Sequence, residues 1–315
     1  MKKNKVVSFV KKDASKIIWS VARLLFLLGI SYVILYPLLS KIVLVFMDSA
    51  DLSDYTVIWV PKHFTLYNIT TVAKIMDYGT VLLRTIGICA LISVLQVFVT
   101  TISAYGLARY KSKLRTIIFG LVIGTLIIPP QTYLVSLYTQ FKNFDPFGLV
   151  SKMTNSSNGI LDTVLVFVAL AITGMGIRSG LYIYVERQTF RALPKELEEA
   201  AKVDGAGLFT TFWRVMLPNA RPTVVLCLLL SFIWQWNDTF YSSMFAPQME
   251  TLALSLGTLS VDISTFLGGW TYVGGSQSQQ LISVGKFLCI IPLVILFILC
   301  QRFFIKGVER SGLVG

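Results

Sequence analysis

Six long apolar stretches constrain this chain more than any other feature of its sequence. A membrane-spanning helix needs about 20 predominantly apolar residues, and six stretches reach that length. They cover residues 21–46, 82–107, 116–139, 162–185, 222–245 and 281–304. Of the 315 residues, 55% are hydrophobic and 14% are charged, whereas soluble domains average about a quarter charged residues. We therefore predict an all-α membrane protein with six transmembrane helices.

Prolines lie inside several of these stretches: Pro37, Pro129, Pro130 and Pro292. Proline lacks a backbone N–H, but neighbouring helices in a membrane can satisfy the carbonyl groups that it leaves free. We therefore keep all six stretches as predicted spans.

The N-terminus is basic and precedes an apolar stretch, as in a secretory signal peptide. The stretch is longer than the roughly 7–15 apolar residues of such a signal, and no small-x-small cleavage site closes it. We expect a retained first span, with a cytoplasmic basic segment over residues 1–20 and a single transmembrane domain over residues 21–315.

The basic residues are distributed asymmetrically. Lys and Arg concentrate before the first stretch, between the second and third, between the fourth and fifth, and after the sixth. Cytoplasmic loops carry such an excess. We therefore predict that both termini are cytoplasmic and that the segment 187–218 also faces the cytoplasm.

The segment 187–218 contains a polar stretch that favours a helix over residues 195–203. Its acidic first turn suits the helix dipole, and Gly205 can adopt the left-handed conformation that ends a helix. We expect a second short helix around residues 210–215, which Leu217 and Pro218 would end. Two interpretations stay open: a docking site for a soluble protein, or an amphipathic connector lying on the membrane surface.

Few residues are available for catalysis or metal binding. The chain has four cysteines, all inside apolar stretches, and one histidine, His63. It has no glycine-rich phosphate loop of the Gly-x4-Gly-Lys-Ser/Thr type. We predict no catalytic residue, no metal site and no cofactor bound by this chain.

Polar and aromatic residues inside spans are candidates for a solute path. In the fifth and third predicted spans these are Trp234, Trp236, Asn237, Asp238, Gln131 and Tyr133. Trp rings stack on sugars and polar groups bind hydroxyls, but an aromatic belt at the membrane surface would have the same composition. We place Arg178 near the inner end of its span, where it would snorkel or bond to another helix.

One motif in the segment 187–218 resembles the coupling loop (EAA loop) of permease subunits of ATP-driven importers. It consists of Glu199-Ala200-Ala201, three residues, Gly205, nine residues, an aliphatic residue, one more residue and Leu217-Pro218. Nearly the whole chain from Trp59 is similar to carbohydrate permeases of the ATP-binding cassette superfamily, in the subgroup of the smaller maltose-type subunit. Further landmarks are Val60 to Asn68, Ala104 to Tyr110, Ile128 to Gln131, Gln188 to Phe190, Trp236 to Asp238, Thr251 to Leu254 and Phe304 to Gly307.

The resemblance implies a type I importer (MetI-like) fold in a bacterial plasma membrane and a set of partners. Two permease subunits would form the pore, two ATPase subunits would hold ATP and Mg, and an extracytoplasmic binding protein would deliver a sugar. Glu199 would make the polar contact to the ATPase, Ala200 and Ala201 would pack closely against it, and Asp204 and Gly205 would form the turn.

Three alternatives stay open. Permeases for amino acids, peptides or anions share the coupling motif. A secondary transporter would need broken helices with ion sites, and usually an internal repeat, and the sequence shows neither. A membrane enzyme would need a catalytic constellation, and none is evident.

Overall fold

The computed structural model of this chain describes residues 2–54, 56–57, 59–110, 112–154, 158–268 and 276–312. Helices form all the regular structure of these residues, apart from one antiparallel bridge between Met47 and Phe64. The all-α prediction is therefore confirmed for this part of the chain. The helical elements, in order, are α1 (Lys2–Val45), η1 (Ser49–Ser53), α2 (Tyr67–Ile75), α3 (Tyr78–Arg109), α4 (Arg115–Ile127), η2 (Pro130–Thr132), α5 (Leu134–Lys142), η3 (Pro146–Gly148), α6 (Leu149–Thr154), α7 (Val164–Ile172), α8 (Ser179–Ala192), α9 (Glu196–Val203), α10 (Leu208–Thr211), η4 (Phe212–Met216), α11 (Leu217–Trp236), α12 (Phe240–Phe245), α13 (Leu252–Phe266) and α14 (Ser276–Gly312).

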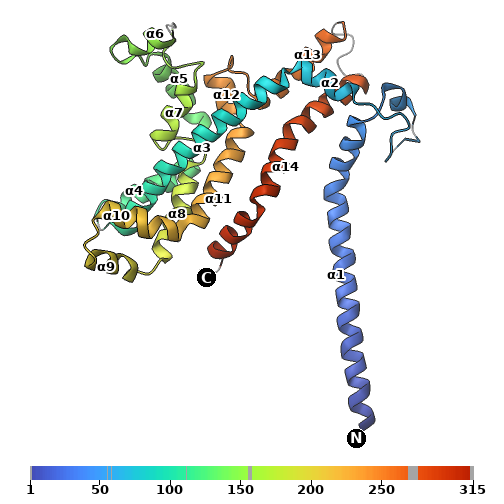
Figure 1. The fold of residues 1–315 in the computed structure, drawn as a ribbon, viewed down its shortest axis with the longest axis horizontal. Coiled ribbons are helices and arrows are strands. Elements are labelled where there is room, and N and C mark those ends of the chain that lie inside the picture. Colours follow the sequence, from blue (N-terminus) through green and yellow to red (C-terminus); the bar gives the residue numbers. More distant parts are fainter. Residues whose placement is uncertain are drawn as a thin grey trace. The chain divides into compact units, whose positions relative to one another are not determined.

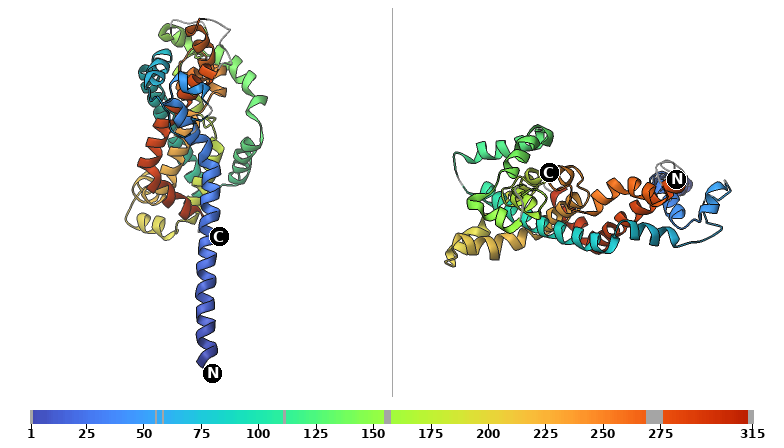
Figure 2. Two further views of the ribbon diagram at one scale, coloured as in Figure 1. Left: turned by 90° about the vertical axis from the view of Figure 1, so that its right-hand side faces the viewer. Right: turned by 90° about the horizontal axis from the view of Figure 1, so that it is seen from above.

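Four helical segments of the described chain are long and apolar enough to cross a membrane (Figure 1). They are Lys16–Val45 within α1, Tyr78–Arg109 (α3), Leu208–Trp236 (α10 to α11) and Ser276–Gln301 within α14. These segments correspond to the first, second, fifth and sixth predicted spans. The predicted boundary at residue 20 lies inside α1, which is drawn as one uninterrupted helix in the left view of Figure 2.

The third predicted span is not one helix. Helix α4 ends at Ile127, and the chain continues through η2 into α5. Ile128 precedes a proline and is extended (φ −72°, ψ 119°), because a proline ring disfavours helical geometry in the residue before it. Pro129 and Pro130 therefore break this span, and the prediction that the membrane helix would accommodate them is wrong.

The fourth predicted span is also broken, between α7 and α8. Gly174 (φ 73°) and Arg178 (φ 61°) both have left-handed backbones, which a right-handed helix cannot contain. The sequence contains glycines here, but the high hydropathy of the stretch led to the prediction of one continuous helix.

The fifth span begins earlier than predicted and continues through Pro218. The expected short helix around residues 210–215 does not end at Leu217 and Pro218, since α10, η4 and α11 follow one another without a gap. Element η4 is a π-helical turn, in which the Leu217 N–H donates to the Phe212 carbonyl five residues back. Such a turn widens the helix just before the proline, whose ring would otherwise clash with the preceding turn.

Contacts divide the chain into two compact units, Met1–Ile75 with Ser260–Leu288 and Met76–Leu259 with Cys289–Gly315. In the second unit, α3 is the central helix and packs against α7, α8 and α11, while α4 packs against α8. The prediction of one transmembrane domain over residues 21–315 stays a prediction.

In the first unit, two buried amides hold the end of α1. The Asn68 side chain donates to the carbonyls of Val45 and Met47 at 3.3 and 2.8 Å. The Gln280 side chain donates to those of Leu44 and Met47 at 3.0 and 2.6 Å. The last carbonyls of a helix have no intrahelical partner, so these amides replace the water that would otherwise bind them.

Candidate functional site

The coupling loop is built on helix α9, which starts two residues after Pro194. Glu196, Glu198 and Glu199 occupy its first turn, where negative charge interacts favourably with the helix dipole. The helix predicted over residues 195–203 is therefore confirmed to within one residue. Figure 1 shows α9 and α10 together at one end of the second unit, with α5 and α6 at its opposite end.

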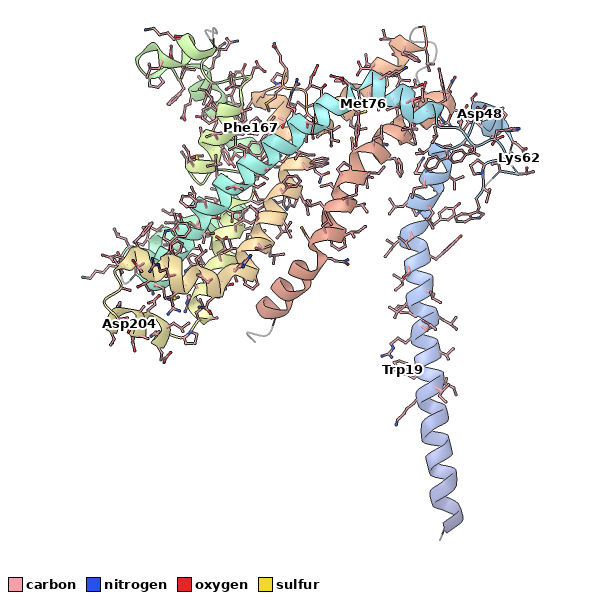
Figure 3. All side chains as sticks on the ribbon, in the orientation of Figure 1. Trp19, Asp48, Lys62, Met76, Phe167 and Asp204 are labelled. Atoms are coloured by element: carbon pink, nitrogen blue, oxygen red, sulfur yellow. The ribbon has the colours of Figure 1, made fainter. Side chains whose placement is uncertain are left out.

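Gly205 ends α9 in the predicted left-handed conformation, with φ 78°. Its N–H donates to the Lys202 carbonyl at 3.0 Å, and the Ala206 N–H donates to the Ala201 carbonyl at 2.9 Å. This pair of bonds is a Schellman motif. It reverses the chain between α9 and α10 and leaves Asp204 exposed at the tip of the turn (Figure 3).

Arg109, at the end of α3, anchors the coupling loop. Its Nε lies 3.3 Å from Oε1 of Glu198, and its guanidinium also donates to the Leu193 carbonyl. The two side chains of this ion pair are only 9% and 16% exposed, so water screens the pair less than it screens a surface pair. Sequence analysis included Arg109 in the landmark from Ala104 to Tyr110 and among the basic residues between the second and third stretches, but missed this role.

Apolar packing fixes the same loop from the other side. Phe190, Met216 and Ala220 are fully or almost fully buried, and Leu193, Leu197 and Leu217 pack against their cluster. Burying one such large side chain contributes about 1.5–3 kcal/mol. The coupling loop is therefore a rigid extension of α3, α8 and α11.

The outer face of the loop is exposed and mixes acidic with apolar groups. Glu199, Ala200, Asp204, Gly205 and Pro218 are exposed. Val203, Leu208 and Phe209 are 87%, 72% and 76% exposed, and sequence analysis did not single out the last two.

The two alanines of the motif differ in their exposure. Ala201 is 7% exposed and lies against its own chain, so only Ala200 is available to another protein. We had expected both to pack against the ATPase.

The candidate path residues lie at the break in the third span and around the end of α11, where the fifth predicted span is interrupted after Trp236 and resumes as α12. Gln131 and Asn237 are exposed there, and the Tyr133 hydroxyl lies 3.2 Å from that of Tyr241. Irregular backbone at membrane depth occurs where it is buried in protein or lines a water-filled cavity. The structure thus brings Tyr133 close to the fifth-span break, although sequence analysis had treated the two spans separately.

Two of the candidates have structural partners within the chain. Asp238 accepts bonds from the N–H groups of Tyr241 and Ser242, at 3.1 and 2.8 Å, and from the Ser242 hydroxyl at 2.8 Å. It therefore caps α12. The Trp236 indole is 3% exposed and donates to the Cys289 carbonyl at 3.2 Å. A place in the solute path stays a prediction for both residues.

Residues 96–311 match the family "Binding-protein-dependent transport system inner membrane component". This range is more than half of the chain. The chain belongs to this family.

Named permeases are similar to this chain over most of their own length. The melibiose/raffinose/stachyose import permease protein MelC of Bacillus subtilis (strain 168) is 27% identical over 263 residues, which are 83% of this chain and 86% of MelC. The arabinooligosaccharides transport system permease protein AraQ of Halalkalibacterium halodurans is 28% identical over 291 residues, or 91% and 93%. A crystal structure of a bacterial ABC transporter "involved in the import of the acidic polysaccharide alginate" superposes with TM-score 0.71 at 19% identity, covering 92% of this chain and 98% of that one. At this identity it shows the fold alone.

This permease is therefore a multi-pass protein of the bacterial plasma membrane and a subunit of an ABC importer. Such subunits are not enzymes themselves, and an ATPase and a binding protein complete the transporter. The predicted family, the role as a permease subunit of an importer and the localisation are confirmed, whereas the role of the coupling loop stays a prediction. The broken spans correct one argument made above, since interrupted helices do not distinguish a secondary transporter from this family.

A buried polar network connects the central helices of the permease. Gln96 of α3 is 1% exposed. It donates to the Ile177 carbonyl and the Ser179 hydroxyl at 2.7 and 2.8 Å, and it accepts from the Ser231 hydroxyl at 2.9 Å. One side chain thus joins α3, the start of α8 and α11. Buried polar groups that are satisfied in this way fix a unique packing.

A buried carboxyl group also joins two helices of this permease. Glu186 of α8 is 1% exposed, and its Oε1 accepts from the Thr101 hydroxyl at 2.9 Å. Sequence analysis placed the end of the fourth span at residue 185 and did not consider Glu186. No pattern in the sequence around Gln96 or Glu186 indicates which residues they would bind.

Proposed function

We propose that this permease forms half of a translocation path for a sugar or oligosaccharide and is moved by an ATPase that grips the loop from α9 to α10. The relatives MelC and AraQ are named for oligosaccharide import, which supports a sugar as the solute. A third relative, UgpE of Yersinia pestis, is named for sn-glycerol-3-phosphate transport. An anionic solute is therefore the alternative.

The exposed face of the coupling loop is the observation that supports binding of an ATPase there. Exposed acidic and small side chains lie on α9, and the exposed Leu208 and Phe209 lie on α10. The ion pair of Arg109 and Glu198 connects α9 to α3. A force on α9 would therefore move the whole bundle as one body, as alternating access requires. An ATPase that binds this loop differently in its two states would shift the balance between the inward-facing and outward-facing forms.

The finer arrangement follows the family pattern. We infer six spans with both termini in the cytoplasm, the third and fourth spans being broken helices. A second permease subunit would complete the pore, two ATPase subunits would bind ATP and Mg, and an extracytoplasmic binding protein would deliver the solute. This chain would bind no cofactor itself. The segment Lys16–Val45 has none of its most apolar window buried in its own chain, which leaves it free to contact lipid and the second permease.

Transport by reconstituted vesicles tests this proposal. The complete transporter, with its binding protein, should take up radiolabelled raffinose only when ATP is supplied on the ATPase side. Vesicles that contain both permease subunits without the ATPase should take up none. Uptake that persists without the ATPase would favour an ATP-independent transporter. Uptake of sn-glycerol 3-phosphate but not raffinose would favour the alternative solute.

A further inference from the structure

Arg178 lies in the break between α7 and α8, inside the fourth predicted span. Helix α8 starts at the next residue and runs for 14 residues to the coupling-loop end. At 1.5 Å per residue, Arg178 therefore lies roughly 20 Å from that end. Its predicted place near the inner end of the fourth span stays a prediction.

The Arg178 guanidinium stacks on Trp234 of α11, with its carbon 4.6 Å from the ring centroid. Both side chains are exposed, Trp234 by 42%. A guanidinium that stacks on a ring keeps its N–H donors directed outward in its own plane, where they can bind a carboxylate or phosphate with two parallel bonds.

Acidic groups of the described chain leave this charge unneutralised. None of the ion pairs or side-chain hydrogen bonds between described residues uses the Arg178 guanidinium. Asp238 is engaged as the cap of α12, and Glu186 bonds to Thr101. A charged side chain at membrane depth is costly unless it faces a partner or a water-filled path.

The surrounding residues are built to hold Arg178 in place. Its backbone is left-handed, at φ 61°, which is strained for arginine and persists only where neighbours impose it. Gln96 imposes it by binding Ile177 and Ser179, on either side. Gly176 adds close contact, since a Cβ at that position would lie 2.9 Å from the Gln96 side chain.

We propose that Arg178, stacked on Trp234, is a solute-selecting residue of the translocation path and that the preferred solute carries an oxyanion. This inference rests on the proposed function and narrows its solute to an acidic sugar or to the anionic alternative named there. The guanidinium would bind the oxyanion from the outward edge of its plane.

Uptake of three probes by the complete transporter tests this inference: neutral raffinose, an alginate oligosaccharide with carboxylates, and sn-glycerol 3-phosphate. The main variant is Arg178→Asn, because asparagine tolerates a left-handed backbone but carries no charge. Arg178→Lys keeps the charge without the planar fork. Arg84→Gln is the matched control, since it removes an exposed arginine whose partner is Glu250, at 3.1 Å.

We expect the wild type to take up at least one anionic probe, and Arg178→Asn to reduce that uptake about tenfold or more relative to raffinose and to the Arg84→Gln control. The uptake of the anionic probe by Arg178→Lys should lie between that of the wild type and that of Arg178→Asn. The carboxylate and phosphate probes then distinguish the two kinds of oxyanion.

Three results would overturn the inference. Wild-type uptake of raffinose alone, or equal loss of all three probes in Arg178→Asn, would leave the proposed function intact and remove the selecting role. Reduced co-purification of the second permease with Arg178→Asn would instead assign Arg178 to a subunit contact. Failure of the wild type to take up any probe would refute the proposed function as well.

Discussion

At the residue scale, single side chains connect helices that are distant in the sequence. Arg109, Gln96 and Gln280 each bind backbone or side-chain atoms of another helix. Gln96 lies inside a predicted apolar stretch, and Arg109 and Gln280 lie just outside theirs, so hydropathy alone assigns none of the three a role. Their partners depend on which helices become neighbours, so the roles emerge only in the folded chain.

Glu199 is the residue at which a contact with the ATPase can be tested directly. It is exposed in the first turn of α9, so its replacement should leave the fold intact. We expect Glu199→Lys to reduce ATP-driven uptake about tenfold or more, a loss of about 1.4 kcal/mol in coupling, while membrane insertion is unchanged. The measurement is uptake together with co-purification of the ATPase.

Glu196→Lys is the matched control, because it reverses the same charge on the same exposed turn. The docking role of Glu199 is contradicted if ATPase co-purification and uptake are the same in both variants and in the wild type.

Asp51 makes the loop between α1 and α2 sensitive to acid. The pKa of its carboxyl group is lowered because it accepts hydrogen bonds from the His63 backbone N–H and from the His63 ring, at 2.8 and 2.7 Å. A carboxyl group with a lowered pKa binds fewer protons when folded than when unfolded. It therefore stabilises the loop above its ordinary pKa of about 4, and this contribution is lost as the pH falls through the folded value.

Hydrogen exchange of residues 46–65 as a function of pH measures this effect. We expect the protection factors of the wild type, which are corrected for the intrinsic pH dependence of amide exchange, to fall below about pH 4. The protection factors of Asp51→Asn should respond less to pH. An identical response in both proteins would show that Asp51 does not control the loop. Lys74→Gln, in α2, controls for a general change of charge.

At the element scale, the interruptions of helices are as informative as the helices. Proline ends α4, two left-handed residues separate α7 from α8, and a π-helical turn lets the fifth span pass through Pro218. Hydropathy predicts where apolar segments lie. It does not predict where their backbone bends, because bending depends on local dihedral angles and on the space that neighbours leave.

The turn after α9 is the element whose geometry the coupling function most requires. Proline fixes φ near −65° and has no N–H, whereas Gly205 has φ 78° and donates to Lys202. Gly205→Pro should therefore destroy the Schellman turn, at a local cost on the order of 3 kcal/mol, and abolish ATP-driven uptake.

The control is Gly205→Asn, because asparagine also occurs at this position of helix caps and should retain most uptake. Uptake by vesicles and circular dichroism of the purified protein measure the two effects. Equal uptake by Gly205→Pro and the wild type would mean that the turn does not transmit force.

At the scale of the whole molecule, orientation decides the interpretation. The proposed function requires the coupling loop and the loop between α1 and α2 to lie on opposite sides of the membrane. Asp204 and Lys62, both exposed and both labelled in Figure 3, are suitable reporters. Cys89, Cys227 and Cys289 are buried and Cys300 is partly exposed, so all four would be replaced first.

We expect a membrane-impermeant thiol reagent added outside intact cells to label Lys62→Cys and to spare Asp204→Cys, with the reverse in inside-out vesicles. Labelling of Asp204→Cys from outside would contradict the proposed topology and the ATPase contact together.

The sequence by itself determined the all-α membrane class, the position of the coupling helix, its glycine cap and the family, because these depend on composition, spacing and local backbone preferences. Tertiary structure decided which spans are broken, that Ala201 is buried while Leu208 and Phe209 are exposed, and that Arg109 and Arg178 meet Glu198 and Trp234. These outcomes depend on packing between helices that are distant in the sequence; Arg109 and Leu193, for example, are 84 residues apart. No local pattern encodes which distant residues become neighbours.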